Sequence, residues 1–200
     1  MLVESFNSAW QYIGRRYNSG VICSERHLQA ELFHALYCDP VFMKKYNLRI
    51  EPVLYEGDKD NGKCSGLIPD LLVIGRERKI VAHVEVKYIP HGFVPYKKDV
   101  ASMFYLWNLK ASGGTKFYLD TNPENGDWNY DRPYVVGEDF KMIYCMIGNE
   151  ESDCFVSNHT IWEGYNGMSG KSTDIIQFAG KISKKAAVFE QLHFEGCVKK

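Results

Sequence analysis

Two short segments of the chain place ionisable side chains inside apolar runs. In residues 66–74, Asp70 follows a proline directly at the start of an apolar run, and in residues 82–88, Glu85 and Lys87 alternate with valines. Because successive side chains of a strand point to opposite faces of a sheet, Glu85 and Lys87 share one face. The pattern therefore predicts two carboxylates and one lysine within a central sheet.

These residue types together are suited to metal-assisted hydrolysis. Burying a charge costs several kcal/mol unless the charge is paired, so acids in apolar strands call for a cation. Mg²⁺ is bound by carboxylates, carbonyl oxygens and water, and Asp70, Glu85 and the carbonyl of Val86 are such ligands. Lys87 would lie beside the bound water, where it could orient or deprotonate the nucleophile or balance charge on a phosphate. The predicted cofactor is therefore Mg²⁺, with Mn²⁺ as the alternative ion.

Hydrophobic spacing and turn residues predict the elements that position these side chains. Apolar residues recur at helical spacing in three segments, residues 2–17, 24–36 and 96–109. Runs rich in Val, Ile, Leu and Tyr predict four strands, at residues 48–55, 67–74, 79–89 and 140–147. Short turn-forming stretches between the first three strands favour an antiparallel meander. Residues 120–139 are predicted to form an exposed acidic loop, and the organisation of residues 150–200 stays open.

Pro69-Asp70 followed by Glu85-Val86-Lys87 resembles the signature of the PD-(D/E)XK nuclease superfamily, which has the restriction-endonuclease-like fold. The order helix, three strands, helix, strand is similar too, over residues 21–148. The resemblance implies an α/β (α+β) fold: a central mixed four-stranded sheet flanked by helices, in an αβββαβ core with an N-terminal helix and a C-terminal extension. It also implies that Asp70, Glu85 and Lys87 are catalytic residues of a Mg²⁺-dependent nuclease.

Many nucleases of that superfamily carry a further glutamate on the first core helix, which reaches the metal through water. Glu25 and Glu31 are the candidates here, and Glu25 is favoured because it shares the inward face of Leu28 and Leu32. Glu25 followed by arginine also resembles the start of this helix in archaeal Holliday-junction resolvases. The Gln-x-x-x-Tyr motif of exonuclease members is absent from the helix after Lys87.

Basic residues gather between residues 76 and 98, where six lysines and arginines stand against two acids. Arg76, Lys97 and Lys98 are therefore candidates for binding the phosphates of DNA. The predicted function is hydrolysis of DNA by an endonuclease, in restriction and defence or in recombination and repair. The alternative is a catalytically inactive module of the same fold that binds nucleic acid or a protein partner.

Composition bounds the class of protein. The 200 residues are 45% hydrophobic and carry a net charge of -1, which excludes a disordered chain and a polycation and suits one domain over residues 1–200. The six cysteines lack metal-site spacing and are expected to be reduced thiols. Neither a signal peptide nor a long apolar run is found, so a cytoplasmic protein without membrane contact is expected. Homodimers that cut both strands are common among such nucleases, but the sequence identifies no dimer face.

Other residues with chemical potential form weaker patterns. Residues 164–172 end like a phosphate-binding loop, but Tyr165 stands where the first glycine is required. His27 and His34 have no third metal ligand nearby in sequence and are expected at the surface. His83 lies on the face of Glu85 and Lys87, where it is either a catalytic residue or a buried, hydrogen-bonded histidine.

Overall fold

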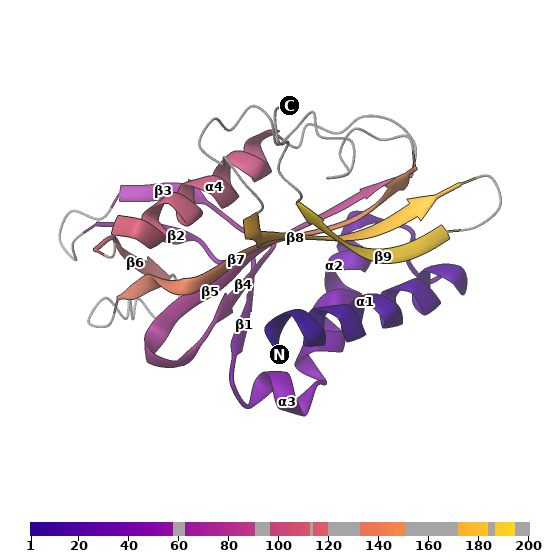
Figure 1. Ribbon diagram of the computed structural model, residues 1–200, viewed down its shortest axis with the longest axis horizontal. Helices are drawn as coiled ribbons and strands as arrows, with labels where there is room; N and C mark the ends of the chain where they lie inside the picture. Colours follow the sequence, from indigo (N-terminus) through magenta and orange to yellow (C-terminus); the bar gives the residue numbers. More distant parts are fainter. Residues whose placement is uncertain are drawn as a thin grey trace, which may run out of the picture.

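The computed structural model describes residues 1–57, 63–90, 97–112, 114–119, 133–150, 172–183 and 187–194. The helices are α1 (Leu2–Asn18), α2 (Glu25–Tyr37), α3 (Pro40–Met43) and α4 (Lys97–Ser112). The strands are β1 (Asn47–Ile50), β2 (Leu54–Glu56), β3 (Lys63–Leu67), β4 (Leu71–Ile74), β5 (Lys79–Ile89), β6 (Lys116–Leu119), β7 (Tyr134–Asn149), β8 (Ser172–Ile182) and β9 (Ala187–Phe194). The fold is mixed α and β, built on a curled mixed sheet (Figure 1).

The three helices predicted from apolar spacing are confirmed as α1, α2 and α4. In α1, the side chains of Phe6, Trp10 and Ile13 recur at helical spacing and are fully buried. The start of α2 is capped as its sequence predicts, because the Ser24 hydroxyl accepts a hydrogen bond from the His27 N–H at 3.2 Å. This cap fixes the start of α2 and therefore the position of Glu25, its first residue.

Among the described residues, nine strands form one sheet, in which β1, β4, β5 and β7 lie side by side. The β1–β4 and β4–β5 pairs are antiparallel, as the predicted meander requires, whereas β5 and β7 run parallel. The beginning of β7 pairs with β6, which leads to β2 and β3, and its second half pairs with β8, which leads to β9. The expected four-stranded sheet is therefore wrong in its number of strands, although its mixed character is confirmed.

Two runs that the sequence predicts as single strands are each divided. Residues 48–55 separate into β1 and β2, which lie far apart in the sheet order, because Glu51 adopts a left-handed φ of 43° and Pro52 cannot donate a ladder hydrogen bond. Residues 67–74 divide between β3 and β4 on either side of Pro69. The second break leaves Asp70 just before β4, outside the regular pairing.

The exposed loop predicted for residues 120–139 is wrong for its last six residues. β7 begins at Tyr134, and the side chains of Tyr134, Val136 and Phe140 are buried against the core. Buried apolar side chains therefore make residues 134–139 part of a strand, although Glu138 and Asp139 are exposed. Residues 120–132 lie outside the described residues, as do residues 164–171 of the phosphate-loop-like stretch.

Helices cover both faces of the sheet: α1, α2 and α3 lie on one face and α4 on the other (Figure 1). Val84 and Val86 of β5 join the core cluster under α1 and α2. Successive β5 residues point to opposite faces, so Glu85 and Lys87 lie on the side of α4. None of the described helices has the length and apolar character needed to cross a membrane.

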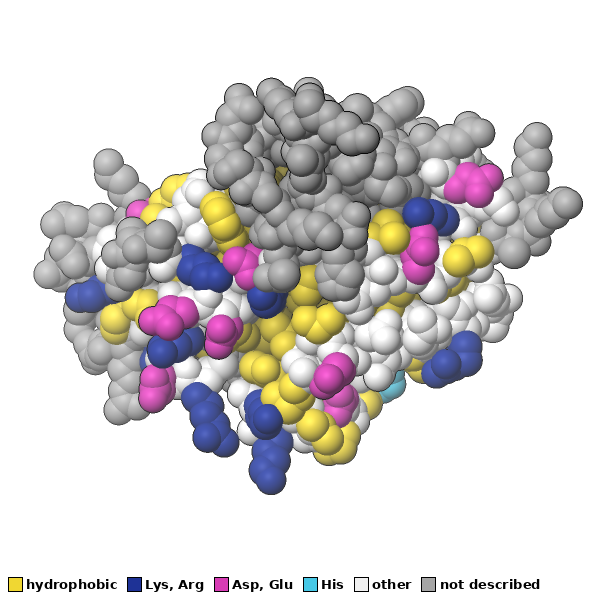
Figure 2. All heavy atoms as spheres, in the orientation of Figure 1, with side chains coloured by type: hydrophobic (Ala, Val, Ile, Leu, Met, Phe, Trp, Pro, Cys, Tyr) yellow, Lys and Arg dark blue, Asp and Glu magenta, His cyan; other side chains and the backbone are white. Residues whose placement is uncertain are grey.

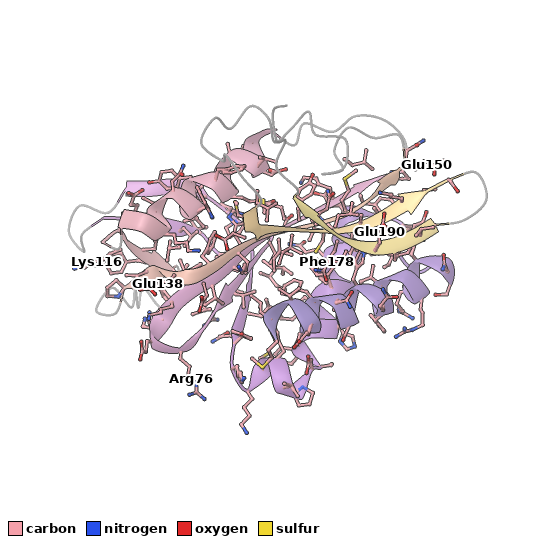
Figure 3. The ribbon with its side chains drawn as sticks, in the orientation of Figure 1. Arg76, Lys116, Glu138, Glu150, Phe178 and Glu190 are labelled. Carbon is pink, nitrogen blue, oxygen red and sulfur yellow. The ribbon has the colours of Figure 1, made fainter. Side chains whose placement is uncertain are left out.

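The C-terminal segment continues the sheet through β8 and β9. β8 runs parallel to β7, and α1 packs over it, where the Trp10 indole donates a hydrogen bond to the Ala179 carbonyl at 3.2 Å. Phe178 of β8 points toward α1 in Figure 3, and its ring lies 6.0 Å from that of Phe6. β8 and β9, the described part of the chain after residue 150, thus belong to the central sheet.

Candidate active site

Asp70 is held at the start of β4 by contacts to both its backbone and its side chain. Its carbonyl accepts hydrogen bonds from the Glu51 N–H at 3.1 Å and from Gln29 Nε2 at 3.0 Å. Its carboxylate Oδ2 accepts the Val86 N–H at 2.6 Å, which ties it to β5. Pro69 has no N–H for a ladder hydrogen bond, so regular strand pairing is interrupted here. At this edge it is the Asp70 carboxylate that bonds to β5.

The edge of β5 is open where Asp70 meets it. β4 pairs with β5 only as far as Val84, which lies opposite Leu71. Within a strand, the N–H and C=O of one residue face the same neighbour, so the Val86 carbonyl points to the side on which its N–H reaches Asp70. Two oxygen atoms that could coordinate a metal ion, one from a side chain and one from the backbone, therefore face this open edge.

Lys87 lies at the same end of β5, between two further acids. Its Nζ is 3.1 Å from Asp99 Oδ2, in the first turn of α4, and 3.4 Å from Glu25 Oε1, in the first turn of α2. Glu25 also accepts the Tyr88 N–H at 3.4 Å. The Lys87 side chain is 10% exposed and that of Glu25 is 43% exposed, so the ion pair lies at the boundary between core and solvent.

The structure separates the two candidate glutamates of α2. Glu25 contacts Lys87, whereas Glu31 accepts hydrogen bonds from Arg16 Nη2 at 2.9 Å and from the Tyr12 hydroxyl at 2.8 Å. The hydrogen bond from Arg16 is the main reason that the pKa of Glu31 is lowered. Glu31 is therefore part of an α1–α2 contact, and Glu25 is the glutamate that reaches the cluster of Asp70, Glu85, Lys87 and Asp99.

Asp70 and Glu85 form a close acidic pair, in which Glu85 is buried and Asp70 is half-buried. Burial and repulsion from Glu85 raise the pKa of Asp70 to about 7. Burial and the nearby charge of Asp99 raise the pKa of Glu85 to about 8, although a hydrogen bond with Asp70 works in the opposite direction. Burial also disfavours the charged form of Lys87, but attraction by Asp99 and Glu25 outweighs it and raises the pKa of Lys87. The cluster holds more carboxyl groups than it holds positive charges to balance them.

His83 is fully buried, and its Nε2 lies 2.5 Å from Glu85 Oε1. Burial lowers the pKa of His83 to about 4, so the ring is neutral at neutral pH. Its Nδ1 has no hydrogen-bond partner among the described residues. Of the two interpretations that the sequence left open, the buried, hydrogen-bonded one therefore describes His83, and its partner is an acid of the cluster.

The predicted phosphate-binding residues lie in different places. Arg76 is in the turn that joins β4 to β5, and Figure 3 shows it at the end of the sheet where Glu138 lies, pointing away from the strands. Lys79 and Lys87 mark the two ends of β5, which at ~3.3 Å per residue are roughly 26 Å apart. Arg76 is thus remote from the cluster, and its role as a phosphate contact stays a prediction. Lys98 is exposed in the first turn of α4, next to Asp99, and the side chain of Lys97 lies outside the described ones.

Figure 2 shows basic and acidic side chains interspersed over the described part of the face in view. The surface seen there carries no extended field of one sign, in keeping with the net charge of -1.

Sequence reasoning missed Asp99 and Gln29. Asp99 was visible as an acid in the first turn of a predicted helix, but nothing in the sequence shows that this turn meets Lys87. Gln29 lies beside the apolar stripe of α2 and is 9% exposed, and a buried amide at that position signals a polar partner. Its partner, the Asp70 carbonyl, is brought near only by the fold.

Within the part of the chain that the structure describes, no group of three or more His, Cys, Asp and Glu side chains is arranged to hold a metal ion. The site has two acids, Asp70 and Glu85, and the Val86 carbonyl is the other oxygen at the open edge of β5. The thiols of Cys23, Cys38 and Cys145 are free. In comparisons with known proteins, no protein-family model, no curated protein and no solved structure matches this chain.

Proposed function

We propose that this protein is a metal-dependent phosphodiesterase that hydrolyses nucleic acid, with DNA as its substrate. The observation that carries the proposal is the close pair of Asp70, just before β4, and Glu85 of β5, which meet at one open strand edge with Lys87 beside them. The raised pKa values of the two acids reflect negative charge held close together out of water. A divalent cation would relieve that repulsion.

The order of elements around the cluster supports a restriction-endonuclease-like core. α2 is followed by β1, β4 and β5, then by α4 and β7, with β2, β3, β6, β8 and β9 as additions. The cluster draws Glu25 from the first core helix, Asp70 from just before β4, Asp99 from α4, and Glu85 and Lys87 from β5. This is the arrangement expected for a PD-(D/E)XK nuclease, with Glu25 in the position of the helix acid.

The donor set suits Mg²⁺ or Mn²⁺. Asp70 and Glu85 have hard carboxylate oxygens, and the Val86 carbonyl faces the same edge. Mg²⁺ sites commonly use one or two protein carboxylates and complete their coordination with water and substrate phosphate, so two acids suffice. When bound, the ion would lower the pKa of a bound water and polarise the phosphate.

The residues of the chain have separate tasks in this proposal. Asp70 and Glu85 hold the ion, and the hydrogen bond from His83 orients the carboxylate of Glu85. Glu25 and Asp99 hold the Lys87 ammonium at the open edge. Because these acids raise the pKa of Lys87, it acts as a cation that stabilises negative charge on the phosphate under attack.

Cleavage of supercoiled, linear and single-stranded DNA in Mg²⁺ or Mn²⁺ tests the proposal. The wild type is expected to nick or linearise the circle, and Lys87→Met is expected to lower the rate by at least ~100-fold, because it loses the charge next to the phosphate. Lys79→Met, at the far end of the same strand and 48% exposed, is the matched control and is expected to cleave normally.

Equal rates for wild type and Lys87→Met would contradict the assignment. DNA binding without cleavage by the wild type would instead favour the non-catalytic module. Restriction and defence, or recombination and repair, are the cytoplasmic settings that fit such an enzyme, and a homodimer is the arrangement that would cut both strands.

A further inference from the structure

A cleft lies beside Asp70, between α2 and the edge strand β1. Its volume is about 450 Å³, and it is lined by Phe33 of α2 and by residues 48–53. We propose that this cleft binds one unpaired base of the nucleic acid whose backbone is hydrolysed at Asp70 and Glu85. The inference rests on the proposed function and deepens it by naming the substrate class, a nucleic acid with an unpaired nucleotide next to the scissile bond.

The wall of the cleft is hydrogen-bonded directly to Asp70. The Glu51 N–H donates to the Asp70 carbonyl at 3.1 Å, and Gln29 Nε2 donates to that carbonyl at 3.0 Å and to Glu51 Oε1 at 3.3 Å. Glu51 has a φ of 43°, a left-handed conformation that side chains rarely adopt and that these hydrogen bonds hold. A ligand in the cleft therefore lies one residue from Asp70, within reach of a nucleotide adjacent to the reacting phosphate.

The apolar part of the cleft suits a planar ring. The rings of Phe33 and Tyr37 are stacked, with centroids 5.6 Å apart and an interplanar angle of 18°. Tyr37 is 57% exposed and Ile50 is 47% exposed, so large apolar surfaces face solvent on both α2 and β1. Aromatic side chains that border nucleic-acid sites stack on bases, and any base has a face to offer.

The charged groups of the cleft favour a base over a free phosphate. Arg49 and Glu51 both line it, so their charges offset each other and an isolated anion gains little there. Both side chains can form hydrogen bonds to base edges, arginine as a donor and glutamate as an acceptor. The volume of about 450 Å³ lies within the range of small-ligand sites and leaves room for a single base.

Binding is tested with two hairpin oligonucleotides that carry the fluorescent base 2-aminopurine, one with this base unpaired at the end of the duplex and one fully paired. The protein carries Lys87→Met so that the DNA stays intact, and Mg²⁺ is present. We expect tighter binding of the unpaired form, with fluorescence quenched by stacking on the cleft. Ile50→Glu is expected to weaken that binding about ten-fold and to abolish the quenching, while the paired form changes by less than about two-fold.

Two further variants control the measurement. Val188→Glu places the same charge at a 56% exposed apolar position on β9, away from the cleft, and is expected to bind like the parent protein. Phe33→Leu keeps apolar bulk but removes the aromatic ring, and it should lose the quenching while α2 stays folded.

The outcomes distinguish failure of the cleft proposal from failure of the nuclease proposal. Equal affinity for both hairpins, or equal losses in Ile50→Glu and Val188→Glu, overturns the cleft proposal, while wild-type cleavage of plasmid DNA decides the nuclease proposal independently. Quenching that depends on Ile50 supports the base site even where the wild type cleaves no DNA, and in that case the nuclease proposal alone fails.

Discussion

Two acidic centres of this protein differ in how their charge is balanced. Asp174 of β8 accepts hydrogen bonds from Trp107 Nε1, Lys110 Nζ and Lys141 Nζ at 3.1, 3.0 and 2.7 Å. Burial alone would raise the pKa of Asp174, but these three donors outweigh it and lower the pKa. One carboxylate is therefore matched by two lysines, which makes this centre a structural link between α4, β7 and β8.

At the candidate active site the balance is reversed. Asp70 and Glu85 have pKa values raised to about 7 and about 8, and Lys87 is shared with Glu25 and Asp99. A centre with surplus acid holds protons or attracts a cation, whereas a balanced centre needs neither. Comparing the two centres shows that burial of an acid is not by itself a sign of function, and that the excess of acid over base is the informative feature.

The largest expected difference between the two centres is their response to Mg²⁺. At a Mg²⁺ concentration of 100 times its Kd, the wild type should gain about 2.7 kcal/mol in free energy of unfolding, because the ion binds only the folded state. Asp70→Asn should lose this gain, and Asp174→Asn should keep it. Thermal unfolding with and without Mg²⁺ measures both, and a full gain in Asp70→Asn would show that the ion binds elsewhere.

Without metal, the same two substitutions should act in opposite directions on stability. Asp174→Asn removes the charge that two lysines share and should lower the free energy of unfolding by about 2 kcal/mol. Asp70→Asn removes a buried, repelled charge while its amide oxygen can still accept the Val86 N–H, so stability should stay equal or rise. Urea unfolding at pH 8 in a chelator measures this, and a large loss in Asp70→Asn would mean that the carboxylate is balanced after all.

His83 should affect metal affinity through Glu85. His83→Leu removes the hydrogen bond to Glu85 Oε1 and is expected to weaken Mg²⁺ binding about ten-fold, in the range found for groups that orient metal ligands. His83→Gln retains a donor near the position of Nε2 and should recover most of the affinity. Isothermal titration calorimetry with Mg²⁺ measures the metal affinity of the folded protein directly. Equal affinities of the Leu and Gln variants would assign His83 to packing alone.

The smallest expected effect is the pH dependence of the metal-free protein. Asp70 and Glu85 have folded-state pKa values above their unfolded values, so the stability that they contribute is complete at low pH and is lost as pH rises through about 7 and about 8. Between pH 6.5 and 8 the free energy of unfolding should fall on the order of 1 kcal/mol per pH unit, mainly through Glu85, because the Asp70 contribution is lost chiefly below pH 7.

Two other groups titrate outside that window. His83, with its pKa lowered to about 4, loses stability only as pH falls below 6.5, and Asp174, with its pKa lowered, does so at still lower pH. Asp70→Asn should remove the fall in stability that Asp70 causes between about pH 4 and 7, and Asp174→Asn should leave that fall unchanged. A slope that is unaltered in Asp70→Asn would contradict the charge surplus at the site.

Local patterns predicted much of the fold and of the candidate site. The periodicity of α1, α2, α4 and β5 is strong, and alternation along β5 correctly placed Glu85 and Lys87 on the face opposite the core valines. The inward face of α2 also favoured Glu25 over Glu31. These features depend on residues at most a few positions apart, which is why periodicity reveals them.

Features that depend on distant pairings could not be predicted. The split of residues 48–55 placed β1 and β2 far apart in the sheet order. β8 and β9 were unassigned because β8 pairs with β7 and β9 pairs with β8. Asp99 meets Lys87 only because α4 packs over the end of β5. Arg76 was grouped with Lys97 and Lys98 by closeness in sequence, yet most of β5 separates its turn from Lys87.

The sequence by itself determined which side chains are available, where the helices and β5 run, and that Glu85 and Lys87 share one face of β5. Only the tertiary structure decided that Asp70 reaches the Val86 N–H, that Glu25 and Asp99 flank Lys87, and that a cleft adjoins them. The physical reason is that helical and strand periodicity is set by local backbone geometry. Charge surplus and cleft shape arise from long-range packing, which brings together residues that no local pattern relates.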